Sequence, residues 1–157
     1  MIGFIAKIVA ALNANSRPGE IAAGFACGVL LALMPAGNLF WPVLFLFFFL
    51  LKLHVGTMIL TIIVFKLWIG VADPLIDSLG LWILQQPALE SFFIQAANTP
   101  VLPLLEFNNA LVTGGLVSGL VLWIPLFLLG RYLVRTYRSG VREKIASSKL
   151  VRFFEKT

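Results

Sequence analysis

The residues that could do chemistry are few, and they lie in or beside long apolar segments. Lys66 is inside one such segment, and Asp73 and Asp77 follow it. A lysine and carboxylates at such a place could form a buried ionic cluster or an ion pathway, because ionisable groups are costly in lipid. Two simpler interpretations compete with this one. Lys66 could reach the membrane edge with its long side chain, and Asp73 before Pro74 could cap a new helix.

We favour the two simpler interpretations, with Asp77 as the ion partner of Lys66. The sets of residues that mark enzymes are missing. His54 is the one histidine and Cys27 the one cysteine, which excludes a multi-cysteine metal site and a histidine pair. The chain has no phosphate-binding glycine loop and no serine–histidine set. We therefore expect a protein that is not an enzyme and that holds neither a metal nor a cofactor.

The composition indicates an integral membrane protein. Of the 157 residues, 60% are hydrophobic and 12% are charged, whereas a soluble domain has about 25% charged residues. The mean hydropathy is +0.98. The net charge of +5 does not indicate a nucleic-acid partner, because eight of the twelve Lys and Arg residues lie in the last 27 positions.

The stretch 18–53 predicts a helical hairpin. Its two apolar runs are each shorter than the about 20 residues that a straight membrane crossing needs. Pro35, Gly37 and Asn38 lie between the runs and form the expected turn. We expect a re-entrant hairpin that leaves the membrane on the side it entered, while two full crossings by this stretch remain open.

Two later segments are expected to cross the membrane, at 55–72 and at 110–130. The first has 18 residues, about 27 Å as a helix, and the second has 21 residues without a charge. Between them, 73–109 is expected to form short helices on the far side. The hairpin, crossings and far-side helices together make a membrane domain at 16–135.

Small residues spaced by four predict where the helices pack. Gly24 and Gly28 lie in the hairpin, and Gly115 and Gly119 lie in the last crossing segment. Such stripes let helix backbones approach closely in lipid. We expect Gly24 and Gly28 to face the small residues of 110–130.

Amphipathic segments are expected at both ends of the chain. Residues 1–15 predict a helix that lies in the headgroup layer or, as an open alternative, packs on the protein. Residues 136–157 predict a basic tail helix on an anionic membrane surface. The basic residues of this tail that we assign to the membrane surface are Arg138, Arg142, Lys144, Lys149 and Arg152.

The positions of the basic residues predict the orientation. No Lys or Arg occurs from Leu67 to Gly130, whereas Arg17, Lys52 and the tail are basic. Cytoplasmic loops carry an excess of Lys and Arg. We therefore expect a multi-pass membrane protein with both termini in the cytoplasm.

The sequence also resembles a known family. The residues that carry the resemblance are Gly24-Phe25, Gly28, Pro35, Gly37, an arm ending Leu-Lys-Leu-His54, and Asp73-Pro74-Leu75. Together with the glycine-rich last helix they are similar, over about residues 16–135, to the bacterial membrane family called domain of unknown function 2062. The family pattern usually has Asn at position 73 and a polar residue close to His54. The chain is most similar to a small subgroup whose gene lies beside that of a large envelope protein, which implies a partner in the envelope.

Two functions remain to be weighed. We expect a non-enzymatic inner-membrane subunit that works with a large periplasmic or envelope protein, with lipid transport between membranes as its task. The alternative is a self-sufficient small transporter or channel, in which broken or re-entrant helices and the ion cluster carry the activity. Association of the chain with itself stays open in both.

Overall fold

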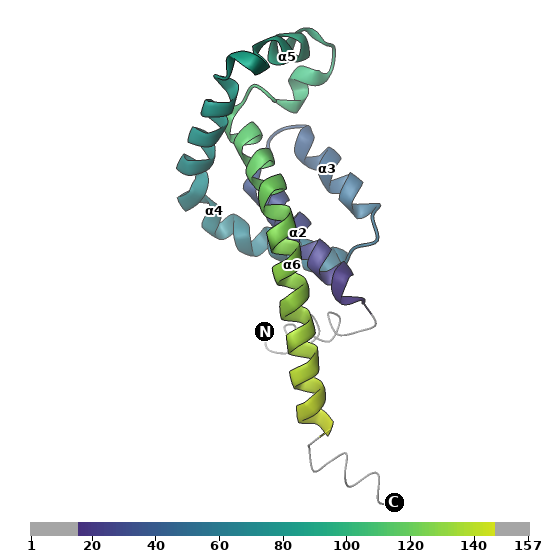
Figure 1. Ribbon diagram of the computed structural model, residues 1–157. Coiled ribbons are helices and arrows are strands. Elements are labelled where there is room, and N and C mark those ends of the chain that lie inside the picture. Colours follow the sequence, from purple (N-terminus) through teal and green to yellow (C-terminus); the bar gives the residue numbers. More distant parts are fainter. Residues whose placement is uncertain (1–15, 147–157) are drawn as a thin grey trace, which may run out of the picture.

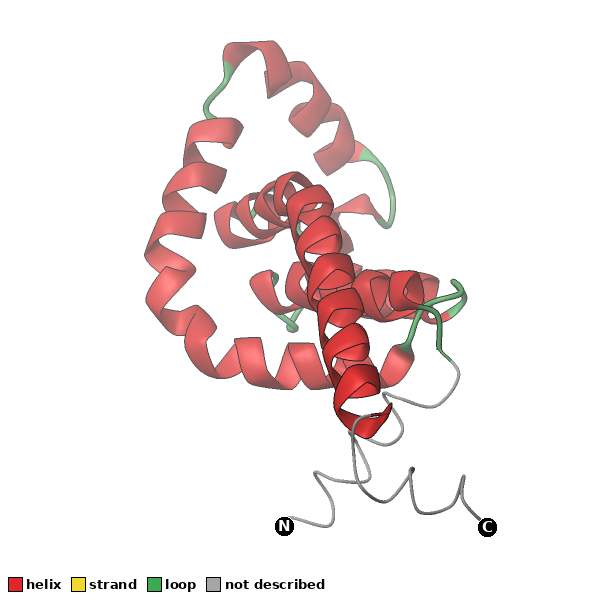
Figure 2. Cartoon of the chain, turned by 60° about the horizontal axis from the view of Figure 1, so that its bottom comes forward, coloured by secondary structure: helices red, strands yellow, loops and turns green. Residues whose placement is uncertain are grey.

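The computed structural model describes residues 16–146, and side chains as far as residue 140, and this range contains helices and no strands (Figures 1 and 2). The all-helical fold class is therefore confirmed. The expected helix at 1–15, together with Lys149 and Arg152, lies outside the described residues. The elements are α2 (Pro18–Leu33), α3 (Phe40–Phe49), α4 (Val55–Leu84), α5 (Pro87–Asn98), the short 3-10 helix η1 (Leu102–Leu105) and α6 (Ala110–Ala146).

α2 lies at the centre of the fold. It packs against both α4 and α6, which also contact one another. Nearly all of its residues from Ile21 to Leu33 are buried. A helix that is apolar on every face is expected in such a central place. α3 differs, because Phe48 is its one buried residue and its other apolar side chains are partly or largely exposed.

α4 and α6 are long and apolar enough to cross a membrane. Their most apolar 18-residue windows are only 17% and 28% buried inside the protein. The core helix of a soluble protein would be mostly covered by its neighbours. Leu67, Trp68 and Val71 of α4, for example, are each more than 70% exposed. Extended apolar surface of this kind favours membrane association.

The structure corrects the expected helix boundary at Asp73. The expected crossing at 55–72 and the element after it form one helix, α4, with Pro74 inside it. Proline removes one hydrogen bond and bends a helix without having to end it. α4 follows a curved path around α2 and α6 in both views (Figures 1 and 2). Asp73 therefore lies within a helix, and its expected role as an N-cap is wrong.

α6 is also longer than expected. It continues without a break past residue 130 to Ala146, with Pro125 inside it. The residues after Gly130 include Arg, Tyr and Leu and no proline, so no residue there stops the helix. The expected separate tail helix at 136–157 is thus, as far as Ala146, a continuation of α6.

Gly24 and Gly28 face α4, and the expected contact with α6 is wrong for them. A Cβ atom on Gly24 would lie 2.5 Å from the carbonyl oxygen of His54. One on Gly28 would lie 2.7 Å from the carbonyl oxygen of Met58. The reason is that α2 has a neighbour on two sides, and its glycine stripe is on the side of α4.

Glycines also lie in the other two helix interfaces. Gly115 and Gly119 of α6 lie against Leu33 and Leu30 of α2, so they do contact α2, but through its leucine face. Gly80 of α4 lies directly against the backbone of Ala110 at the start of α6. Each pair among α2, α4 and α6 therefore meets where one helix lacks a side chain, as expected for helices that associate in lipid.

We predict that Gly80→Ala destabilises the protein by about 1 to 3 kcal/mol, because its new Cβ would overlap the Ala110 carbonyl group. The control in the same helix is Gly70→Ala, because no atom within 4 Å opposes a Cβ there. This control should leave the stability unchanged or raise it by up to about 1 kcal/mol. Thermal unfolding in detergent measures both variants. Equal stability of the two would contradict the packing described.

Candidate functional site

The candidate site lies where α2 ends and the chain turns toward α3. The C-cap residue Met34 has an extended backbone, as expected for a residue that precedes a proline, here Pro35. The last carbonyl groups of a helix have no partner within that helix. Met34 and Leu31 are fully or nearly fully buried, and an unsatisfied carbonyl group in apolar surroundings is costly. The turn therefore needs hydrogen-bond donors from other residues.

Asn38 and Trp41 provide two of these donors. The Nδ2 group of Asn38 donates to the carbonyl oxygen of Pro35 at 3.2 Å, and its Oδ1 atom accepts from the backbone N–H of Trp41 at 2.9 Å. The indole Nε1 group of Trp41 donates to the carbonyl oxygen of Leu31 at 2.9 Å. Asn38 thus holds the turn and starts α3, while Trp41 ties α3 back to the end of α2. Gly37 is exposed and nothing opposes a side chain there.

Lys66 of α4 provides the third donor. Its ammonium group donates to the carbonyl oxygen of Met34. The carbonyl end of a helix carries a partial negative charge, so a cation is favourable at this position. Lys66 is thus bound to the protein backbone. The structure does not show the expected extension of its side chain toward the membrane edge.

Asp73 and Asp77 both follow Lys66 in α4. Asp73 lies two helical turns further along α4, on the same face as Lys66. Asp77 lies one further turn along α4, and its expected pairing with Lys66 stays a prediction. The contact that the fold makes is therefore between Lys66 and the carbonyl end of α2.

The turn also contacts a distant segment that includes η1. The backbone N–H of Leu39 donates to the carbonyl oxygen of Leu104 in η1 at 3.2 Å. The rings of Phe40 and Phe107 lie 5.0 Å apart. These pairs are more than 60 positions apart, and no local pattern predicts such a contact.

His54 and Cys27 both have structural partners. His54 is the N-cap of α4, and its Nδ1 atom accepts from the backbone N–H of Thr57 at 3.0 Å. Its own backbone N–H donates to the carbonyl oxygen of Glu20 at 3.0 Å. The indole N–H of Trp123 points to the sulfur of the buried Cys27 at 3.4 Å. These contacts account for both side chains without a ligand.

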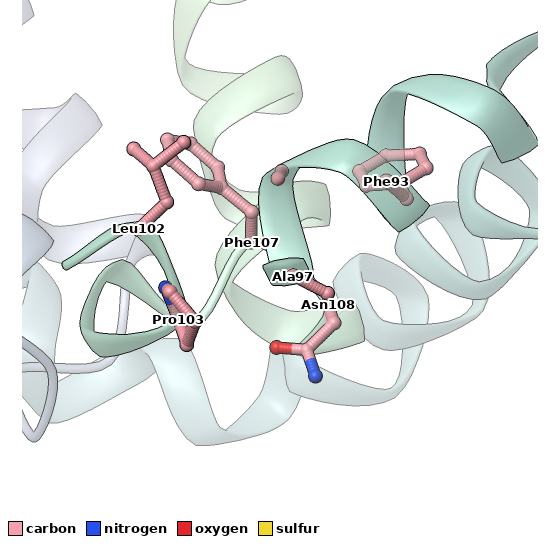
Figure 3. A pocket seen from close by; sticks show the side chains of 7 residues that line it. Phe93, Ala97, Leu102, Pro103, Phe107 and Asn108 are labelled. Atoms are coloured by element: carbon pink, nitrogen blue, oxygen red, sulfur yellow. The ribbon is translucent and has the colours of Figure 1, made fainter. Parts of the chain in front are cut away.

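A small pocket lies between α5 and η1 (Figure 3). Its volume is about 30 Å³, which is room for about one water molecule. Its lining residues are Phe93, Ala96, Ala97, Leu102, Pro103, Phe107 and Asn108. Within residues 16–140 no three His, Cys, Asp or Glu side chains gather closely enough to hold a metal ion.

Comparison with known proteins finds relatives that are themselves uncharacterized. Residues 4–142 match the family described as an uncharacterized protein conserved in bacteria (DUF2062). A protein of Treponema pallidum (strain Nichols), named only as an uncharacterized protein, is 33% identical over 145 residues, which cover 92% of this chain and 90% of that protein. No solved structure matches the chain. The family match includes the hairpin turn and Lys66.

We predict that Lys66→Met destabilises the protein by about 1.5 to 3 kcal/mol, because it removes a charged donor and leaves the Met34 carbonyl group unsatisfied. Lys52→Met is the control, because Lys52 is exposed in the loop before α4, and it should change stability by less than about 0.5 kcal/mol. Thermal unfolding in detergent is the measurement.

The double variant Lys66→Met with Asp73→Asn separates the hydrogen bond from the charge pair. If the bond to Met34 is what matters, the double variant should be as unstable as Lys66→Met alone. A return to normal stability would show instead that the neutralisation of Asp73 by Lys66 was the important interaction.

Proposed function

The chain belongs to the bacterial family DUF2062, and we propose that it is a non-enzymatic subunit of the bacterial inner membrane that works with a large envelope protein. The observation that carries this proposal is the projecting unit of α5 and η1, which we call the α5–η1 cap.

The hairpin fits a re-entrant element. Its beginning and its end are joined, because the backbone N–H of His54 donates to the carbonyl oxygen of Glu20. The chain therefore leaves the hairpin at the level where it entered. Irregular backbone is tolerated at membrane depth only where the protein satisfies it. Asn38, Trp41 and Lys66 do so at the turn.

The distribution of charge supports an orientation with both termini in the cytoplasm. Arg17 and Lys52 lie close to the Glu20–His54 hydrogen bond, and Arg131 follows the contact of Gly130 with α2. The α5–η1 cap lies at the opposite end of the bundle (Figure 1). It belongs to the stretch from Leu67 to Gly130, which has no Lys or Arg. Basic residues favour the cytoplasmic side.

The α5–η1 cap has the surface of an interaction site. Neither α5 nor η1 has a buried residue, and α5 contacts mainly η1 and the end of α4. Phe92, Ile94 and Leu104 are each more than 50% exposed. Exposed apolar side chains gathered at one end of a protein are typical of a docking surface. The resemblance to the subgroup implies that the partner is a large envelope protein. We propose that the two proteins together transport lipid between membranes.

A specific observation favours a second candidate, a self-sufficient small transporter or channel. α2 ends inside the bundle, and Lys66 is bonded to its carbonyl end. Helices that end within the membrane form the substrate and ion sites of many transporters. Ion or substrate flux by the purified chain alone in liposomes would favour this candidate over the subunit.

We predict a labelling pattern that tests the orientation. Single cysteines replace Ser16, Gln95 and Ser147 in a chain in which Cys27 is changed to Ala. With the outer membrane made permeable, a membrane-impermeant thiol reagent should label only position 95, because the basic residues keep the other two positions in the cytoplasm. Labelling at 16 or 147 but not at 95 would invert the orientation.

A second experiment tests the partner. Phe92→Ala with Ile94→Ala should lower the amount of large envelope protein that co-purifies with the tagged chain from its native membrane by about tenfold, because it removes apolar side chains that a partner would bury. The control is Leu120→Ala with Val121→Ala, two exposed apolar residues of α6 away from the cap. Mass spectrometry quantifies the partner. Equal recovery with both double variants would contradict a docking role for the cap.

A further inference from the structure

Arginines from α2 and α6 meet at one level of the bundle. The two helices run antiparallel, because Gly115 lies against Leu33 and Gly130 lies against Ala22. Arg17 is five residues before Ala22, and Arg135 is five residues after Gly130. Five residues of helix span about 7.5 Å.

Arg17 and Arg135 therefore lie at about the same distance beyond the Ala22–Gly130 contact, at the same end of the bundle. Two more cations belong to this end. His54 is bonded to Glu20, and Lys52 lies two residues before His54. Arg131 directly follows Gly130. All four basic side chains are exposed, and Glu20 is an acidic residue beside them.

The level of these cations is also the edge of the exposed apolar surface. Leu51 is the neighbour of Lys52, and Leu129 lies two residues before Arg131, and both leucines are about half exposed. Tyr132 is exposed between Arg131 and Arg135. Tyrosine, lysine and arginine are the residues enriched where a membrane protein passes from hydrocarbon to headgroups.

We propose that Arg17, Lys52, Arg131 and Arg135 form a belt that binds the phosphate groups of anionic phospholipids. A belt of cations from three separate segments matches the headgroup layer, which surrounds a membrane protein at one level. Arginine binds phosphate through paired hydrogen bonds, and lysine acts as a point charge. The proximity of exposed leucines selects a lipid rather than a soluble phosphate compound, because the acyl chains of a bound lipid would cover them. The belt rests on the membrane placement proposed above and does not depend on the envelope partner.

The test is thermal unfolding of the purified full chain in detergent during titration with phosphatidylglycerol. Phosphatidylglycerol should raise the unfolding temperature, and phosphatidylcholine at the same concentration should not. Each Arg→Gln or Lys→Gln change in the belt should weaken the apparent affinity for phosphatidylglycerol about fivefold. The charge-preserving set Arg17→Lys, Lys52→Arg, Arg131→Lys and Arg135→Lys should retain most of the affinity, which separates charge from packing.

Three outcomes would overturn the proposal. They are no stabilisation by phosphatidylglycerol, full stabilisation of the set with all four Gln changes, and equal stabilisation by sodium phosphate, which would show a general anion site. If the fourfold Gln variant does not fold, the pairs Arg17→Gln with Lys52→Gln and Arg131→Gln with Arg135→Gln give the same reading. The envelope partner is absent from this assay, so a negative result would not bear on the co-purification experiment. The labelling pattern tests the membrane placement separately.

Discussion

A helix that ends among apolar side chains must find donors for its last carbonyl groups, and the structure depends on how α2 meets this constraint. Trp41 at the start of α3 and Lys66 in the middle of α4 donate to carbonyl groups at the end of α2, and Asn38 donates to the carbonyl group of Pro35 in the turn that follows. Without them the break between α2 and α3 would expose unsatisfied backbone to an apolar environment, which costs several kcal/mol for each group. The first role of the Lys66 ammonium group is therefore to donate a hydrogen bond to the carbonyl end of α2.

The glycine contacts allow this arrangement. Lys66 can reach the end of α2 because α4 crosses α2 closely at Gly28, where Thr61 of α4 packs. A larger side chain at that crossing would push α4 away and lengthen the distance from Lys66 to Met34. Close packing and the satisfaction of backbone groups are thus coupled in this bundle. The same coupling explains why a lysine is tolerated in a segment that is otherwise apolar.

The two ends of the bundle have different chemistry, and the hairpin turn is connected to one of them. Exposed cations gather where the hairpin begins and ends, and the opposite end has the apolar α5–η1 cap with Glu90 and Glu106. The turn contacts this cap directly through Leu39 and Leu104. A protein bound at the cap would therefore lie next to the hairpin turn. At this turn α2 ends inside the described bundle, and Lys66 binds the carbonyl end of the helix. This proximity links the two proposed functions, because a partner at the cap would be in place to act on the turn.

The sequence by itself determined the features that depend on local composition and spacing. Long uncharged runs predict apolar helices, the breaker at Pro35 to Asn38 predicts a turn, and the motif residues identify the family. The tertiary structure decided which surfaces meet. It made Pro74 a bend within α4, turned Gly24 toward α4, and brought Lys66 to a carbonyl group 32 positions away. The physical reason is that propensity and periodicity act over a few turns of one helix, whereas a hydrogen-bond partner or an opposing glycine is chosen by the packing of segments that are distant in the chain.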